Sequence, residues 1–393
     1  MTKYNFDEII KRENTNSFKF DLRHKFFGTH DVYPMWVADM DFKTPSFVID
    51  ALKKRLEHEI LAYSFQPEGF RTSVVNWMKK RHGWEIKPGW ISYSPGVVPS
   101  LNIAVTAFTQ PGDKVIVQPP VYFPFFQAVK NNNRILVDNP LQLSKGRYFM
   151  DFDDLKKKID SKTKLLLLCN PHNPAGNVWK KEELEELTDI CIKNDILIIS
   201  DEIHSDIVYK PNKHIPTASL SSETANQTIT LMSPSKTFNI AGLFTSMVII
   251  SNPVLQKKFD KLFNDFHMSQ GHIFGSIAHE AAYSKGEEWL EELLTYLKGN
   301  IDFLTEYLNN YIPEINVISP EATYLVWLDC RKLGLNKDEL RTFFIEKAQL
   351  GLSEGAIFGT NGDGFQRINI ACPRSIVEQS LQKLNKAVEK LRE

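Results

Sequence analysis

The sequence has few cysteines, no excess of either charge and no long apolar run. Its four cysteines are scattered without a Cys-x-x-Cys pair, which favours buried free thiols in a reducing compartment over a disulfide or zinc framework: Cys169, Cys191, Cys330 and Cys372. The 47 Lys and Arg residues nearly balance the 48 Asp and Glu residues, so the chain has no long-range attraction for nucleic acid or an anionic membrane. No apolar run reaches the roughly 20 residues that a transmembrane helix needs, and the polar N-terminus has no apolar core of signal-peptide length. We therefore expect a soluble, cytoplasmic protein without a nucleic-acid or membrane partner.

The 393 residues suffice for one large and one smaller domain. From about residue 90 to 250, short apolar runs alternate with longer amphipathic stretches, and runs such as Leu165–Leu168 are apolar on both faces, like strands covered by helices on either side. This alternation predicts a mostly parallel, doubly wound sheet. The expected strands are Trp90–Tyr93, Lys114–Val117, Ile135–Val137, Lys164–Leu168, Ile196–Ile199, Thr228–Met232 and Thr245–Ile250, with helices at Pro99–Phe108, Lys180–Lys193 and Pro253–His267.

The pattern changes after residue 285. A long amphipathic helix over Glu287–Tyr311 leads into further strands and a terminal helix, which indicates a second, α+β domain: Ile315–Val317, Thr323–Leu328, Phe365–Ala371 and Ser375–Leu391. The N-terminal forty or so residues have no partner of their own and can pack against it. We expect a large domain over residues 48–285 and a small domain built from residues 1–47 and 286–393.

Four polar clusters come directly after expected strands, where ligands of open α/β sheets bind. Ser94–Val98 opens a helix, and its free N–H groups can face an anion, although many helices simply begin after a Pro-Gly turn. In Asn170–Gly176, two Asn-Pro pairs and a glycine force a rigid turn, from which a side-chain amide can donate to a phenolate-like oxygen.

The other two clusters contain charged residues. Asp201 follows a buried strand, where a carboxylate is costly unless it is paired; it either caps a helix or pairs with a protonated ring nitrogen. Lys236 lies between Ser235 and Thr237 at the end of an apolar strand, which is no place for a solvated surface charge.

The order of these motifs, a Pro-Gly turn, N-P-x-N-P-x-G, D-E-x-x-x-D and S-x-S-K, resembles the class I/II aminotransferase-type enzymes of fold type I, which use pyridoxal 5′-phosphate (PLP). The segments Pro34–Phe42, Asp201–Asp206, Ser233–Gly242 and Arg367–Arg374 narrow the resemblance to the PatB/MalY group of C–S β-lyases. The resemblance spans nearly the whole chain. It implies a large domain with a mostly parallel seven-stranded sheet flanked by helices, a smaller α+β domain and an obligate homodimer.

The resemblance also implies roles for individual residues. Lys236 would carry PLP as a Schiff base and move protons at the substrate Cα, Asp201 would keep the pyridine nitrogen protonated, and Tyr122 would stack on the ring, unless it only packs in the core. The remaining cofactor contacts would be Asn173 at the ring oxygen, Gly96, Val97, Val98, Ser233 and Ser235 at the phosphate, Tyr63 from the neighbouring subunit, and His204.

For the substrate, the resemblance implies that Arg367 grips the carboxylate, a bidentate pairing that suits arginine. The backbone N–H of Ala38 would add a donor, and Arg374 would be a secondary contact or only a surface cap. No metal is expected. Two positions depart from the broader aminotransferase pattern: His204 replaces a tyrosine, and Phe244 replaces an arginine or lysine. Both weaken a transaminase assignment and put the role of His204 in doubt, although it could hydrogen-bond Asp201.

The expected reaction is α,β-elimination from L-cystathionine or a related cysteine thioether, giving a thiol such as homocysteine, pyruvate and ammonia, a step toward methionine. The alternatives are an amino-acid aminotransferase, which would use the same residues, and a PLP-bound regulatory protein.

Overall fold

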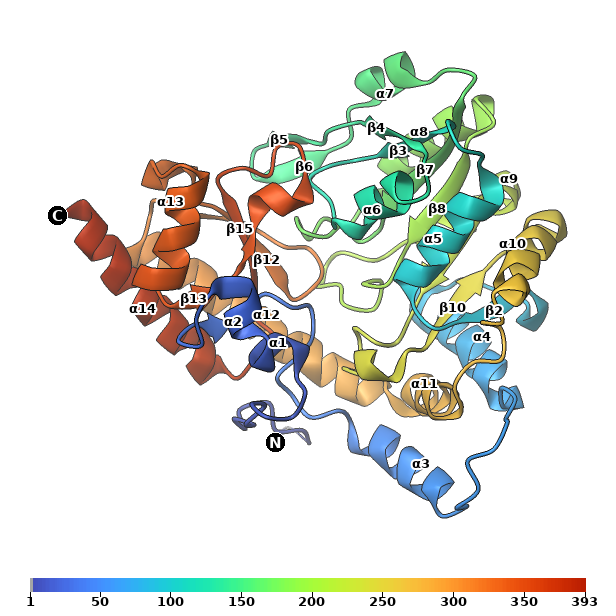
Figure 1. Ribbon diagram of the computed structural model, residues 1–393, viewed down its shortest axis with the longest axis horizontal. Coiled ribbons are helices and arrows are strands. Elements are labelled where there is room, and N and C mark those ends of the chain that lie inside the picture. The colour runs from blue at the N-terminus through green and yellow to red at the C-terminus, as the bar shows by residue number, and fades with distance from the viewer. Residues whose placement is uncertain (1–2) are drawn as a thin grey trace.

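A computed structural model describes residues 3–393, which fold around two main sheets (Figure 1). The larger sheet has seven strands, and β10 runs antiparallel to both of its neighbours while the other strand pairs are parallel. In spatial order the strands are β2 (Ile91–Ser94), β10 (Ser246–Ile249), β9 (Thr228–Met232), β8 (Leu197–Asp201), β7 (Thr163–Cys169), β3 (Lys114–Val117) and β4 (Ile135–Asp138). The predicted mostly parallel, seven-stranded sheet is confirmed.

Helices cover both faces of this sheet because its central strands are apolar on both sides. Alternate residues of a strand point to opposite faces: Leu165 and Leu167 pack with α5, α6 and α10, whereas Leu166 and Leu168 pack with α8. The helices of this part are α3 (Ser46–Leu56), α4 (Glu68–His82), α5 (Val97–Phe108), α6 (Pro124–Lys130), α7 (Phe152–Lys158), α8 (Lys181–Lys193), α9 (Ser222–Asn226), α10 (Pro253–Asp265) and α11 (Ile273–Lys285). A short hairpin, β5 (Gln142–Ser144) and β6 (Arg147–Phe149), also belongs to it.

The smaller sheet is antiparallel, in the order β11 (Asn316–Ile318), β12 (Leu325–Asp329), β15 (Phe365–Asn369), β14 (Ser353–Glu354). Its helices are α12 (Glu287–Tyr311), α13 (Lys337–Thr342) and α14 (Arg374–Arg392), and α12 has the predicted limits. Two predicted strands were too long. Thr323 has a φ of 69°, so β12 begins only at Leu325, and β15 ends at Asn369, whose side chain accepts from the N–H of Ala371.

The N-terminal residues pack on this smaller part. Strand β1 (Tyr33–Pro34) pairs in parallel with β13 (Leu350–Gly351), and Phe6 packs edge-on against Trp289 of α12. Figure 1 shows α1 (Phe18–Asp21) and α2 (Arg23–Phe27), in blue, beside the orange and red C-terminal elements. Residues from both ends of the chain therefore contribute to one part of the molecule. The domain limits, 48–285 for the large domain and 1–47 with 286–393 for the small one, stay a prediction.

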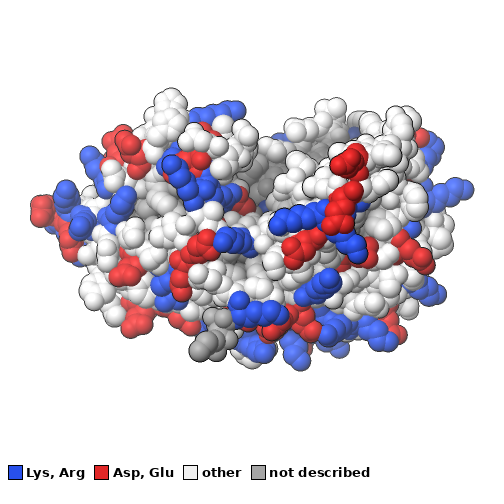
Figure 2. Space-filling view, turned by 90° about the horizontal axis from the view of Figure 1, so that it is seen from below, with Lys and Arg blue, Asp and Glu red and all other residues white. Residues whose placement is uncertain are grey.

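The cysteines are free thiols and the surface charges are mixed, as the sequence predicts. All four cysteines are free and buried, and burial raises the pKa of each thiol. Figure 2 shows basic and acidic side chains interspersed over one face of the molecule. Among residues 3–393, no helix is both long enough and apolar enough to cross a membrane, and no cluster of His, Cys, Asp or Glu is suited to hold a metal ion.

Candidate active site

Three neighbouring parallel strands bring the predicted clusters together. The ends of β7 and β8 lie side by side, with Cys169 opposite Asp201, and Asp201 is opposite Leu231 of β9. The turn Asn170–Gly176 follows β7, and the turn Ser233–Asn239, which contains Lys236, follows β9. The two turns therefore begin on opposite sides of Asp201, the last residue of β8.

Asp201 is a buried carboxylate with little compensation from the protein. Its one side-chain hydrogen bond among the described residues is accepted from the N–H of Ile203, at 3.1 Å. The pKa of Asp201 is raised to about 7, mainly by burial and also by the adjacent Glu202, although the Ile203 N–H and Lys236 lower it. A buried carboxylate is stable as an anion only when it is paired. A protonated ring nitrogen placed here supplies that pairing.

The half-buried Lys236 extends toward the N-terminal segment. Its Nζ donates to the carbonyl oxygen of Ala38 at 2.7 Å, and the hydroxyl of Tyr324 donates to the same oxygen at 3.0 Å. Burial lowers the pKa of Lys236, which favours the neutral amine needed for Schiff-base formation and proton transfer. Ala38 thus contacts the site through its carbonyl, while the proposed role of its N–H stays a prediction.

Arg367, on β15, is a buried guanidinium. Its Nη1 donates to Asn173 Oδ1 at 2.9 Å and its Nη2 donates to the carbonyl of Trp36 at 2.8 Å, while its Nε has no partner among residues 3–393. Burial lowers the pKa of Arg367 to about 10. All the hydrogen-bond partners of Arg367 among residues 3–393 are neutral, so its charge is available to a carboxylate ligand. Asn173 joins it to the turn after β7.

The start of α5 lies beside the loop that follows β9. Ser246 Oγ of β10 donates to the carbonyl of Ser94 at the end of β2, and Ser233 Oγ donates to the carbonyl of Thr245, just before β10. The hydroxyl oxygens of Ser233 and Ser235 are 2.8 Å apart. The first N–H groups of an α-helix have no partner within the helix. With Gly96 as N-cap of α5, those of Val97 and Val98 and the Ser235 hydroxyl offer donors suited to a phosphate.

A backbone hydrogen bond holds Tyr122 beside the turn after β7: its N–H donates to the carbonyl of Asn173 at 3.1 Å. Burial raises the pKa of its phenol, so the ring stays neutral near pH 7. Stacking of this ring on a cofactor stays a prediction.

His204 is brought close to the site but has no partner there. It is buried, its Nδ1 is unpaired among the described residues, and burial lowers its pKa to about 3. Its ring stands edge-on to that of Tyr324, with centroids 6.3 Å apart. Within residues 3–393, no hydrogen bond joins it to Asp201, so the hydrogen bond considered from the sequence is not formed.

Two predicted residues lie apart from this group in the single chain. Tyr63 is 99% exposed, in a stretch before α4 without helix or strand. Arg374 begins α14 and turns toward α12, where its Nε donates to Asn300 at 2.7 Å and its guanidinium lies 5.0 Å from the ring centre of Phe303. The side-chain contacts that the structure shows for Arg374 are with α12, and its role at the substrate stays a prediction.

Other residues of the site were missed from the sequence. Tyr324, Trp36 and Ser353 contact Ala38 or Arg367, and Asn239 binds the N–H of Met40. A single Tyr before a strand or Ser within one carries no local signal for such a role. Asn239 was the exception, since it lies in the same polar cluster as Lys236.

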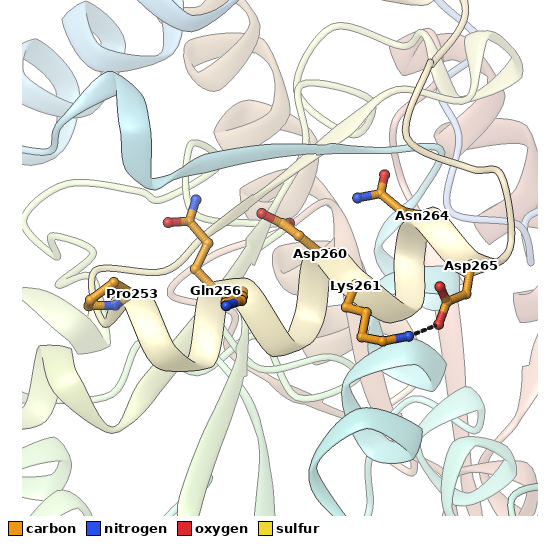
Figure 3. Close-up of a pocket in the computed structure, with 7 residues that line it drawn as sticks. Pro253, Gln256, Asp260, Lys261, Asn264 and Asp265 are labelled. Carbon is orange, nitrogen blue, oxygen red and sulfur yellow. Dashed lines mark hydrogen bonds and ion pairs between the residues drawn. The ribbon is translucent and has the colours of Figure 1, made fainter.

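A surface groove along α10 is separate from this site (Figure 3). It contains an ion pair between Lys261 and Asp265, 2.6 Å apart, and none of the predicted site residues lines it. The lining residues are Pro253, Gln256, Lys257, Asp260, Lys261, Asn264 and Asp265.

The family model for aminotransferase class I and II matches residues 32–384, which is most of the chain. The chain belongs to this family. Cystathionine beta-lyase PatB of Bacillus subtilis is 42% identical over 98% of this chain and 100% of its own length. Among solved structures, PLP-containing cystalysin from Treponema denticola has a TM-score of 0.95 and 41% identity, with 99% of both chains covered. A PLP-bound C–S lyase from Staphylococcus hominis has a TM-score of 0.92 and 37% identity, with 98% of both chains covered. This family has fold type I of the PLP-dependent transferases, which confirms the fold class predicted from the sequence.

Proposed function

We propose that this protein is a PLP-dependent C–S β-lyase that cleaves L-cystathionine, or a related cysteine thioether, to a thiol, pyruvate and ammonia. One observation carries the proposal: Asp201, a buried carboxylate without a salt-bridge partner among residues 3–393, lies at the strand ends that also place Lys236 and Asn173. A ligand with a protonated ring nitrogen, an aldehyde and a phosphate complements this group and the start of α5. The activity follows from the full-length similarity to proteins named as cystathionine and C–S lyases.

When bound, PLP supplies an electron sink for the negative charge that develops at the substrate Cα. Lys236 accepts the Cα proton, and its lowered pKa increases the fraction of neutral amine available for that transfer. Arg367 binds the substrate carboxylate and thereby fixes the direction of the Cα–H bond. Asp201, once paired with the ring cation, remains ionised. A thiolate leaves readily, so holding and deprotonating Cα are the main tasks of these residues.

We further propose a homodimer in which Tyr63 reaches the phosphate site of the neighbouring subunit. The stretch around Tyr63 exposes several large apolar side chains, an arrangement that marks a protein interface: Leu56, Ile60, Leu61 and Phe65 are between 51% and 86% exposed. In the proposed homodimer, a second copy of this chain covers these side chains and receives Tyr63 at its phosphate site.

The product and the free thiols suggest a biological setting. Cleavage of L-cystathionine yields homocysteine, which is one methyl group short of methionine. Four free cysteines fit a reducing compartment, so we place the enzyme in the cytoplasm.

The decisive experiment adds L-cystathionine to purified protein loaded with PLP and measures pyruvate and free thiol. We expect both in equal amounts without a keto-acid acceptor. The Lys236→Ala variant should lose the visible absorption of lysine-bound PLP and at least about 10³-fold in rate. The control Lys210→Ala, at a lysine 92% exposed, should keep both.

Two results would contradict the proposal. Keto-acid-dependent amino transfer without thiol release would identify an aminotransferase instead. A wild-type protein that acquires no PLP absorption would exclude the PLP site itself.

A further inference from the structure

A second buried carboxylate lies five residues after Asp201 and contacts the turn that carries Lys236. Asp206 is 2% exposed, and its Oδ2 accepts from the hydroxyl of Thr237 at 2.8 Å. Its Oδ1 accepts from Trp77 Nε1 at 2.9 Å and lies 3.0 Å from His82 Nε2. Asp206 thus joins helix α4 to the residue that follows Lys236.

We infer that Asp206, acting through Thr237, is a positioning residue that fixes the main chain at Lys236. This inference rests on the proposed role of Lys236 as the PLP-bearing lysine. Asp206 itself touches neither substrate nor cofactor in this arrangement. Its effect is to hold the point from which the lysine side chain extends.

The contacts of Lys236 explain why such an anchor is needed. Its amine has one hydrogen-bond partner among residues 3–393, the carbonyl of Ala38, and must leave it to reach the cofactor and the substrate Cα. The side chain is long and flexible, so its reach is set by the backbone of the turn. Asn239, three residues after Lys236, fastens the turn to Met40 and Phe42. Thr237, the residue directly after Lys236, is held by Asp206.

The charge of Asp206 makes this anchor strong. Burial alone would raise its pKa, but the hydrogen bonds from His82 and Trp77 and the positive charge of Arg81 hold that pKa below its usual value. Burial lowers the pKa of His82, so the ring is neutral and donates its Nε2–H to the carboxylate. A hydrogen bond from a hydroxyl to such an anion is stronger than one between neutral groups.

The outer end of this set of contacts reaches the surface. His82 lines a pocket of about 940 Å³ together with Tyr209, His214 and Glu291. Removing the His82 side chain therefore leaves a space next to Asp206 that a small molecule can enter from solvent.

The test compares two substitutions at Thr237 in the PLP-loaded enzyme. Thr237→Val removes the hydroxyl and keeps the shape, whereas Thr237→Ser keeps the hydroxyl. With L-cystathionine as substrate, we expect Thr237→Val to lower kcat about tenfold or more. Its KM should stay within about threefold, because Arg367 still binds the carboxylate. Thr237→Ser should retain most of the wild-type kcat.

Two further measurements separate positioning from general stability. The visible circular dichroism of bound PLP reports the fixed orientation of the ring and should change in Thr237→Val but not in Thr237→Ser. The control Thr188→Val removes another buried hydroxyl, which donates to the carbonyl of Glu185 within α8, and should leave kcat and the dichroism unchanged.

Wild-type kcat and dichroism in a folded Thr237→Val variant would overturn the inference. If that variant does not fold, His82→Ala decides: kcat should fall several-fold and recover when imidazole is added, and a kcat equal to wild type would overturn the inference. Failure of the proposed function is visible separately, because wild-type protein would then carry no PLP on Lys236 or release no thiol.

Discussion

At the scale of single residues, the site is defined by groups whose ionisation the protein opposes. Burial raises the pKa of the acid Asp201 and lowers the pKa of the bases Lys236 and Arg367, so each charged form is disfavoured in the folded chain. Structural ion pairs elsewhere satisfy such charges within the protein, as Lys19 does with Asp41. For Asp201, Lys236 and Arg367 we propose that a bound ligand supplies this compensation.

The raised pKa of Asp201 predicts a pH dependence of stability in the cofactor-free protein. Its pKa rises from about 3.9 in the unfolded chain to about 7 in the fold, so the folded state binds the additional proton between these values. The stabilisation is complete below about pH 4 and is lost as the pH rises to 7, by up to about 4 kcal/mol. Thermal unfolding of cofactor-free protein between pH 5 and 8, with Asp201→Asn as control, measures it.

Asp201→Asn should be the more stable of the two cofactor-free proteins above about pH 7, because its amide never ionises. Bound PLP should reverse the order, since the wild-type carboxylate then has a cation to pair with. Parallel pH dependences of wild type and variant without PLP would show that Asp201 does not titrate in this range.

At the scale of elements, the turn after β7 meets β15 and the loop before β12 of the small part. Arg367 of β15 binds Asn173 in the turn after β7, and the two N–H groups of Glu321 and Ala322 donate to the carbonyl of Gly176 in the same turn. Gly176 has a φ of +73°, and a Cβ there would lie 2.7 Å from Pro320. The close approach of the two parts therefore depends on this glycine.

Arg367→Lys tests whether the guanidinium is the carboxylate site. A lysine ammonium cannot bind Asn173, the Trp36 carbonyl and a substrate carboxylate with the same fork geometry. We expect KM for L-cystathionine to rise about tenfold or more, with a smaller effect on kcat. Arg374→Lys is the matched control, and initial-rate kinetics on both variants provide the measurement.

An unchanged KM in Arg367→Lys, with a raised KM in Arg374→Lys, would move the carboxylate site to the start of α14. The contacts of Arg374 with Asn300 and Phe303 argue for the opposite result.

The elements that could be predicted are those whose signal is local. The all-apolar run of β7 and the 25-residue amphipathic helix α12 need no partner to be seen in the sequence. The grouping of the polar clusters could also be predicted, because the carboxyl ends of parallel strands lie at the same edge of a sheet. Tyr324 could not be found in this way, because its partner Ala38 is 286 positions away and is bound through a backbone carbonyl that any residue has.

At the scale of the whole molecule, one N-terminal segment joins the two parts. Residues 36–42 bind Asn239 of the Lys236 turn on one side and Arg367 and Asn369 of β15 on the other. A displacement of the small part relative to the large sheet must therefore act on the carbonyl of Ala38, which holds the amine of Lys236. The pairing of β1 with β13 keeps this segment with the small part.

The homodimer is tested at this scale by Tyr63→Phe, which removes only a hydroxyl. We expect the variant to remain a dimer by light scattering while its PLP dissociation constant rises about tenfold, because one phosphate hydrogen bond is lost. Tyr311→Phe, at another exposed tyrosine, should change neither quantity.

A mixed dimer gives the sharper result. Subunits carrying Tyr63→Phe combined with subunits carrying Lys236→Ala should contain one intact site, if Tyr63 serves the neighbouring subunit. Tight PLP binding to half of the sites would support this arrangement, and its absence would assign Tyr63 to some other role.

The buried cysteines have a consequence for an enzyme that releases thiols. Product thiols oxidise to disulfides, and a protein thiolate at the surface would exchange with them to form mixed disulfides. Attack requires an accessible thiolate, and all four cysteines of this chain are enclosed and keep their protons. The cysteines of this chain are thereby protected from forming mixed disulfides with the thiol that the enzyme releases.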